Sequence, residues 1–158
     1  MAEITNAEIT DSNAKERARL RRSAFNLLAR REQSRSELKT KLLNKDANET
    51  LVEDLLDNLV AEGLQSDERF VESFVNARVQ RQQGPVKIGH ELRQKGVADR
   101  LIDAALESFD DHWFEIAKEL VVKKYGQSEP LDFNDKQRRM RFVMQRGFPA
   151  DICYRLFD

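Results

Sequence analysis

The fold follows from the stretch spanning residues 88–109, which reads IGHELRQKGVADRLIDAALESF. When this stretch is shifted forward by 51 residues, Leu92 falls on Val143, and when it is shifted back by 50 residues, Leu92 falls on Leu42. Lys95 also falls on a basic residue, and Leu101 and Leu106 fall on apolar residues, after both shifts. The first unit departs at Asp46 and Ala47. Because a period of about fifty residues is typical of tandem structural repeats, the chain is predicted to consist of three similar units.

Each unit is predicted to contain three helices. In the middle unit, Ser66 or Asp67 can cap a helix whose apolar residues recur every three or four positions. Pro85 suits the first position of the next helix, where its missing N–H costs nothing, and Gly96 can take the left-handed conformation that ends it. The predicted fold is all-α, an elongated, curved array of stacked repeats. It comprises a polar N-terminal tail and three three-helix repeats, at residues 1–13, 14–64, 65–109 and 110–158.

Composition excludes several classes of protein. The 27 Lys and Arg nearly balance the 28 Asp and Glu, which gives a formal net charge of −1. No apolar run approaches the roughly 20 residues that a membrane-spanning helix needs. Residues 1–13 contain three acids and no Lys or Arg, unlike a signal peptide. We therefore expect a cytoplasmic protein that has no membrane partner.

The sequence offers no obvious catalytic apparatus. A single Cys153 excludes an intrachain disulfide, and with only His90 and His112 beside it no zinc-ligand spacing is available. No phosphate-binding loop, serine-hydrolase elbow or zinc-protease motif occurs. We predict that the protein is not an enzyme and uses no cofactor or metal. Both histidines are expected at or near the surface, and the aromatic residues on helical stripes are expected in the core: Phe70, Phe74, Phe109 and Trp113.

Charge is sorted along the chain despite the balance near zero. The net charge is +7, −7, +4, −6 and +4 over residues 14–46, 47–76, 77–100, 101–135 and 136–158. The second helix of each repeat is basic, so a basic stripe could dock on an acidic partner, either a nucleic-acid backbone or an acidic protein. For any single residue, an ordinary solvated helix face explains the charge equally well. The predicted partner-binding residues are Arg35, Lys39, Lys41, Lys45, Lys87, Arg93, Lys95, Arg138, Arg139, Arg141 and Arg146.

Three segments together resemble a known family. ELKTKL at 37–42, the helix carrying RFVESF at 69–74, and GPVKIGHELRQKGV at 84–97 are similar in type and order to the RecX family of bacterial modulators of the RecA recombinase. The last segment, placed after the helix at 69–74, is the most specific of them. The resemblance extends from Ala14 to Phe157, nearly the whole chain.

The resemblance implies three tandem three-helix repeats that bind the RecA nucleoprotein filament. It implies inhibition of the filament's ATP hydrolysis, strand exchange and coprotease function, and so a role in DNA repair and the SOS response. A monomer with weak binding to single- and double-stranded DNA is expected. Two alternatives stay open: a stand-alone DNA-binding protein that uses its basic second helices, and a helical adaptor for another partner.

Overall fold

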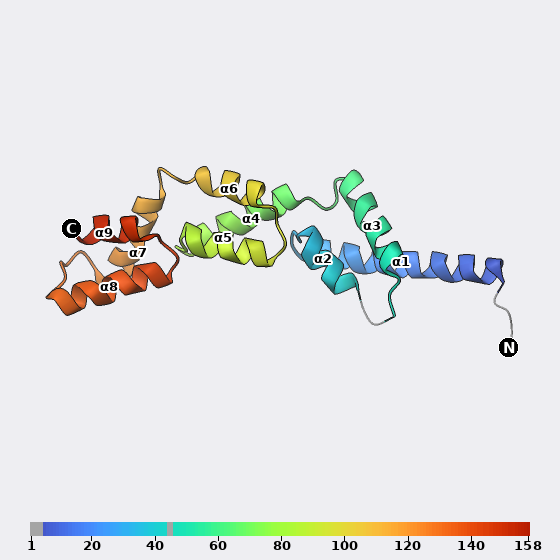
Figure 1. Ribbon diagram of the computed structural model, residues 1–158, viewed down its shortest axis with the longest axis horizontal. Helices are drawn as coiled ribbons and strands as arrows, with labels where there is room; N and C mark the ends of the chain where they lie inside the picture. The colour runs from blue at the N-terminus through green and yellow to red at the C-terminus, as the bar shows by residue number, and fades with distance from the viewer. Residues whose placement is uncertain (1–4, 44–45) are drawn as a thin grey trace. The chain divides into compact units, whose positions relative to one another are not determined.

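The computed structural model describes residues 5–43 and 46–158, and over these residues the chain forms helices joined by turns and loops, with no strand. This confirms the all-α prediction, and Figure 1 shows the helices in chain order. The helices are α1 (Asn6–Arg30), α2 (Arg35–Leu42), α3 (Glu49–Ala61), α4 (Asp67–Gln80), α5 (Pro85–Gln94), α6 (Asp99–Glu107), α7 (Trp113–Tyr125), α8 (Phe133–Gln145) and α9 (Ala150–Phe157). None of these described helices is both long enough and apolar enough to cross a membrane.

The first helix begins earlier than the sequence analysis predicted. It starts at Asn6, inside the segment expected as a polar tail, and Met1 to Ile4 lie outside the described residues. The reason is a capping box, in which the Glu8 amide donates to the Thr5 hydroxyl and the Glu8 carboxylate accepts from the Thr5 amide at 2.8 Å. These bonds satisfy donors that would otherwise be unpaired at the helix start.

Two features of α5 were predicted correctly. Pro85 occupies its first turn, and Gly96, just beyond its C-terminal end, has φ +72°, the left-handed conformation that favours glycine. Together they fix where the helix begins and where the chain turns toward α6. Ser34 does the equivalent for α2, because its hydroxyl accepts from the Glu37 amide at 3.0 Å.

The described chain divides into two compact units, Met1–Phe70 and Val71–Asp158. The first unit contains α1, α2, α3 and the first turn of α4, packed around one apolar core. Each fully buried leucine in this core contributes about 1.5–3 kcal/mol. The buried core residues are Leu20, Ala24, Leu38, Leu42, Leu51, Val52, Leu55, Leu56 and Leu59.

Two buried amides attach the start of α4 to the first unit. Gln33 and Gln65 are both 2% exposed, and the Gln65 amide nitrogen donates to the Gln33 carbonyl at 3.1 Å and to the Asp67 carboxylate at 3.0 Å. The same carboxylate accepts the Arg35 amide at 2.9 Å. Because a buried polar group must be paired, these bonds hold the α3–α4 connection against the α1–α2 connection.

The second unit contains the rest of α4 and all of α5 to α9. Phe70, which ends the first unit, and Trp113 are buried as predicted, whereas Phe74 and Phe109 are only half-buried. Phe109 packs on Trp113 with ring centroids 5.4 Å apart. The buried apolar residues of this unit are Val71, Val75, Ile88, Leu92, Val97, Ile102, Trp113, Ala117, Leu120, Met140, Val143, Phe148, Ile152 and Cys153.

Within the second unit, the α4–α5 turn packs backbone to backbone on the α8–α9 turn. The Gly84 amide donates to the Arg146 carbonyl at 2.8 Å, and the Val86 amide donates to the Gly147 carbonyl at 2.9 Å. A Cβ on Gly84 would lie 2.4 Å from the Gly147 carbonyl, and a Cβ on Gly147 would lie 2.3 Å from the Cβ of Lys87. The second and third three-helix segments therefore meet at two glycines, where an added Cβ has no room.

Candidate partner-binding surface

The cations at the start and middle of α2 are neutralised by α3. Arg35 lies with its Nη2 2.8 Å from both a Glu53 and an Asp57 carboxylate oxygen. Lys39 pairs with Glu53 and lies 3.2 Å from Glu49. Hydrogen bonds from Lys39 and then from Arg35 hold the pKa of the Glu53 carboxyl below its ordinary value. The positive and negative segments of the first repeat therefore compensate each other across two helices.

Lys41 differs from the other α2 cations. Its side-chain nitrogen donates to the Gln33 amide oxygen at 2.8 Å, and within residues 5–43 and 46–158 it has no carboxylate partner. Lys41 is exposed, so its charge is available to a partner. Lys45, also predicted as a contact, lies outside the described residues.

The predicted contacts of α5 and the residues just after it lie in three different environments. Arg93 pairs with Asp99 at 2.9 Å, but both side chains are largely exposed and such a pair is weak. Lys95 lies 5.8 Å from the centre of the Phe74 ring. Lys87 is half-buried and, within the described chain, forms no ion pair.

Arg139, one of the predicted contacts, is buried inside the fold. It is 5% exposed, and its Nε donates to the Asp135 carboxylate at 3.1 Å while Nη1 donates to the Ser128 carbonyl at 2.7 Å. The guanidinium carbon lies 4.8 Å from the centre of the Tyr125 ring. Arg139 therefore anchors the α7–α8 loop from inside the fold.

The other predicted cations on α8 and at its C-terminal end also differ in whether they are bound within the fold or exposed. Arg146 donates from Nη2 to the Arg81 carbonyl and, at 3.5 Å, to the Gln82 carbonyl, so it caps the C-terminal end of α4. Arg138 is 69% exposed and pairs with Asp135. Arg141 is exposed and has no ion pair in the part of the chain that the structure describes.

The predicted residues thus differ in exposure and ion pairing, and do not form one uniform basic stripe. Among the predicted contacts, the exposed or half-exposed cations that form no ion pair with a described residue are Lys41, Lys87 and Arg141. On α1, Arg17, Arg22 and Arg30 are also exposed and form no ion pair over the described ranges. The +7 charge of residues 14–46 signals them, but the sequence analysis assigned that charge to α2 alone.

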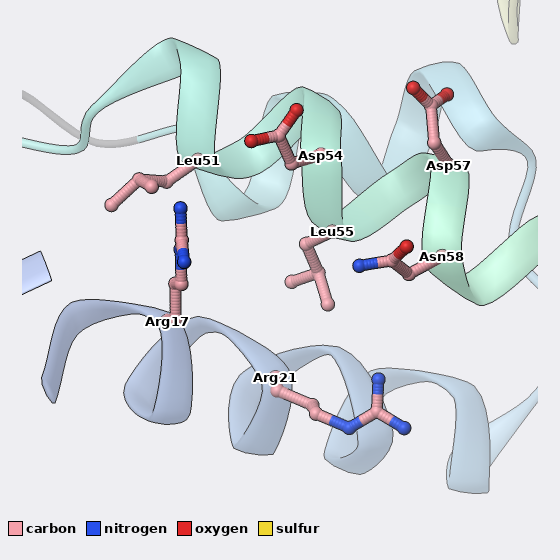
Figure 2. Close-up of a pocket in the computed structure, with 7 residues that line it drawn as sticks. All are labelled: Arg17, Arg21, Leu51, Asp54, Leu55, Asp57 and Asn58. Atoms are coloured by element: carbon pink, nitrogen blue, oxygen red, sulfur yellow. The ribbon is translucent and has the colours of Figure 1, made fainter. Parts of the chain in front are cut away.

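A shallow pocket of about 410 Å³ lies between α1 and α3, and Figure 2 shows its side chains. Arg17 and Arg21 project from α1, and Leu55 and Asn58 of α3 face that helix, whereas the Asp54 and Asp57 carboxylates lie on the far side of α3 (Figure 2). Arg21 is held by two hydrogen bonds to Glu62, at 3.2 and 2.7 Å. The lining combines guanidinium and carboxylate groups with two leucines, so the pocket suits contact with a charged side chain. It is lined by Arg17, Arg21, Leu51, Asp54, Leu55, Asp57 and Asn58.

The nucleophilic and metal-binding residue types do not cluster. His90 and His112 are exposed, and Cys153 is fully buried. Burial raises the pKa of the Cys153 thiol, so the thiol is not activated. Among the described residues, no group of three His, Cys, Asp or Glu side chains lies close enough together to hold a metal ion.

Family models match the chain in three consecutive segments. They describe the first, second and third three-helix domains of RecX, and they match residues 21–59, 66–106 and 110–157. The chain belongs to the RecX family. Its three-helix segments are therefore the tandem domains of that family, and α1 to α3, α4 to α6 and α7 to α9 correspond to them in order.

Individual RecX proteins resemble the chain over most of its length. "Regulatory protein RecX" of Halorhodospira halophila is 42% identical over 132 residues, 84% of this chain and 82% of the relative. The protein of that name from Pseudomonas savastanoi pv. phaseolicola is 42% identical over 139 residues, 88% of this chain and 90% of the relative. A crystal structure of regulatory protein RecX superposes with a TM-score of 0.80 at 25% identity, covering 98% of this chain and 78% of that one. RecX from Lactobacillus salivarius has the same fold, with a TM-score of 0.78 at 23% identity over 90% of this chain and 95% of that one.

Sequence reasoning missed the residues that shape the third RecX domain from inside. Asp135 and Arg139 are four residues apart on α8, the spacing at which opposite charges meet on a helix. That spacing was visible, but their burial depends on how the α7–α8 loop folds back. The contact between Gly84 and Gly147 was not predicted, because it joins segments far apart in the sequence.

Proposed function

We propose that the chain is a non-enzymatic regulator that binds the RecA nucleoprotein filament and inhibits its ATPase, strand-exchange and coprotease activities. The observation that carries this proposal is the match to all three RecX domains, together with relatives that are named regulatory proteins. RecA enters through the resemblance of the sequence to this family of RecA modulators. In a cytoplasmic setting, such a protein modulates DNA repair and the SOS response.

The exposed cations supply a physical basis for docking. A RecA filament on DNA carries phosphate charge, so unpaired cations on the regulator attract it and speed association. Lys87 on α5 and Arg141 on α8 are the unpaired members of the predicted set in the second unit, and Lys41 is its counterpart in the first. Arg93 and Arg138, largely exposed but paired, are secondary contacts.

The test is RecA's single-strand-dependent ATP hydrolysis, measured with increasing amounts of the chain. We expect inhibition, and we expect Lys87→Glu with Arg141→Glu to weaken it while far-UV circular dichroism stays unchanged. The matched control reverses two charges elsewhere in the same unit, with Lys118→Glu and Lys123→Glu on the exposed part of α7. Unchanged ATP hydrolysis at an excess of the wild-type chain would refute the proposal.

Naked DNA provides the second arm of this test. A stand-alone DNA-binding protein would hold naked duplex with an affinity that falls steeply as salt rises. Tight, salt-sensitive binding to naked duplex, without any effect on RecA, would replace the proposed function with that alternative.

A further inference from the structure

Two large apolar side chains of the α7–α8 loop and the start of α8 are displayed to solvent. Leu131 is 89% exposed and Phe133 is 72% exposed, whereas the other exposed large apolar residues of the described chain are 58% exposed or less. Leaving a leucine and a phenylalanine in water forgoes the stabilisation that burial would bring. Their exposure is therefore not explained by the packing of the third domain.

The segment that carries these side chains is held in place by buried charge. Asp135 and Arg139 are 6% and 5% exposed. The Asp135 carboxylate accepts the Leu131 amide at 3.1 Å, and Arg139 donates to the Ser128 carbonyl at 2.7 Å. Asp132 caps α8 by accepting the Asp135 amide at 2.8 Å. Because the loop is fixed before any partner arrives, little conformational entropy is lost when its side chains are buried in an interface.

The loop is also clear of the contact between the second and third domains. It precedes α8, whereas the turn that packs on Gly84 follows α8, so the two lie at opposite ends of that helix (Figure 1). A cavity of about 320 Å³ lies under residues 126–130, between the loop, α7 and α9. Leu131 and Phe133 are not among the residues that line it, so they do not close this cavity.

Charge restricts what the two side chains can enter. Glu129 and Asp132 are exposed carboxylates on the same loop, and Arg138 and Arg139 of α8 are paired with Asp135. Carboxylates beside an insertion point repel nucleic-acid phosphate and anionic lipid headgroups alike. They favour a protein surface in which an apolar pocket is bordered by cations.

We propose that Leu131 and Phe133 form a preformed apolar anchor that inserts into a pocket bordered by cations on the protein surface of the RecA filament. This inference rests on the proposed function. It divides the interface into a cationic part that attracts the filament and an apolar part that retains it. Apolar anchors at the centre of an interface dominate its binding free energy, so the anchor governs dissociation more than association.

The test compares binding of full-length variants to RecA assembled on single-stranded DNA. We expect Leu131→Ser with Phe133→Ser to weaken binding roughly 30-fold or more, mainly through faster dissociation, and to do so equally at low and moderate salt. Glu129→Lys should weaken binding a few-fold, because it places a cation against the cations that border the pocket. The matched control, Ile9→Ser with Val60→Ser, removes two apolar side chains that are each 46% exposed and should bind like the wild type.

The possible outcomes test the proposed function and the apolar anchor separately. If the wild-type chain does not bind the filament, the proposed function fails and this inference fails with it. If the wild type binds and the Leu131/Phe133 double variant binds equally well, only the anchor is refuted. Vesicles of anionic lipid form a separate arm: binding by the wild type that the double variant loses would assign the anchor to a membrane and refute the protein pocket.

Discussion

Gly84→Ala is expected to open the contact between the α4–α5 turn and the α8–α9 turn. The new Cβ would lie 2.4 Å from the carbonyl carbon and oxygen of Gly147 and 2.5 Å from the amide nitrogen of Phe148. These are backbone atoms, which cannot rotate aside as a flexible side chain can. To reach an ordinary contact of 3.4 Å, the two turns must separate by about 1 Å.

The magnitude follows from the two hydrogen bonds that this separation breaks. The amide of Gly84, a buried residue, loses its acceptor, and an unsatisfied buried donor costs about 1–3 kcal/mol. Val86 is 58% exposed, so the loss of its hydrogen bond costs only the usual net value of about 0.5–1.5 kcal/mol. Gly84 has φ −87° and ψ 167°, which alanine also adopts, so the variant gains about 0.4–1 kcal/mol from a less flexible unfolded chain. The net loss in the free energy of unfolding is about 0.5–4 kcal/mol.

Trp113 makes the assay specific for the second unit. It is the single tryptophan of the chain and is 4% exposed, so urea unfolding followed by its fluorescence reports the third domain. The control is Gly63→Ala in the first unit, where φ is +71° and no atom lies within 4 Å of the new Cβ. That variant bears only the backbone cost of a left-handed alanine, about 1–2 kcal/mol, and should not move the fluorescence transition.

A Gly84→Ala variant within about 0.5 kcal/mol of the wild type in the fluorescence transition would refute this reasoning, because surface changes without a specific mechanism stay within that range. It would show that the two turns do not pack backbone to backbone. Destabilisation by Gly63→Ala in the same transition would show instead that the two units unfold as one. A second spectroscopic probe in the first unit would then be needed to follow the unfolding of each unit.

Three further outcomes are expected. Gln65→Ala should lower the free energy of unfolding by about 1–3 kcal/mol, because it leaves the buried Gln33 carbonyl unpaired; urea unfolding by far-UV circular dichroism measures this, and an unchanged midpoint contradicts it. The lowered pKa of Glu53, caused first by Lys39, means that its contribution is complete above the ordinary value of 4.5 and lost as the pH falls through the folded-state pKa. Glu53→Gln should therefore flatten the decline in urea midpoint seen on acidification below about pH 5, and a decline as steep as in the wild type opposes this. Cys153 should react with a thiol reagent only in urea, since it is buried and its pKa is raised, and rapid reaction of the native protein would disprove its burial.

Local sequence signals were sufficient for most of the helical architecture. Pro85 and Gly96 placed the ends of α5, since a missing N–H and a left-handed conformation are properties of single residues. The start of α1 could also have been read, because Thr5 and Glu8 have the spacing of a capping box. Residues 1–13 were predicted as a polar tail because they are polar, and a capping box acts independently of an apolar stripe.

The candidate site was harder to predict because pairing across helices depends on packing. Arg35 and Lys39 form a basic pattern on their own helix, yet their partners Glu53, Asp57 and Glu49 lie on another. Which acids they meet is set by how α2 and α3 rotate around the core between them. Net charge by segment therefore located cations and anions correctly but could not show that they neutralise one another.

This internal pairing lowers the number of predicted contacts that are free to bind phosphate. For duplex DNA, the logarithm of affinity falls with the logarithm of salt by about 0.9 for each phosphate neutralised. If Lys41, Lys87 and Arg141 alone contact phosphate, the slope on naked duplex is about −3, and Arg17, Arg22 and Arg30 extend it to about −5. A slope near −10 would mean that many more cations than these contact DNA. A shallow slope, with firm binding to RecA filaments, would instead assign retention to contacts that salt does not screen, as the Leu131 and Phe133 anchor predicts.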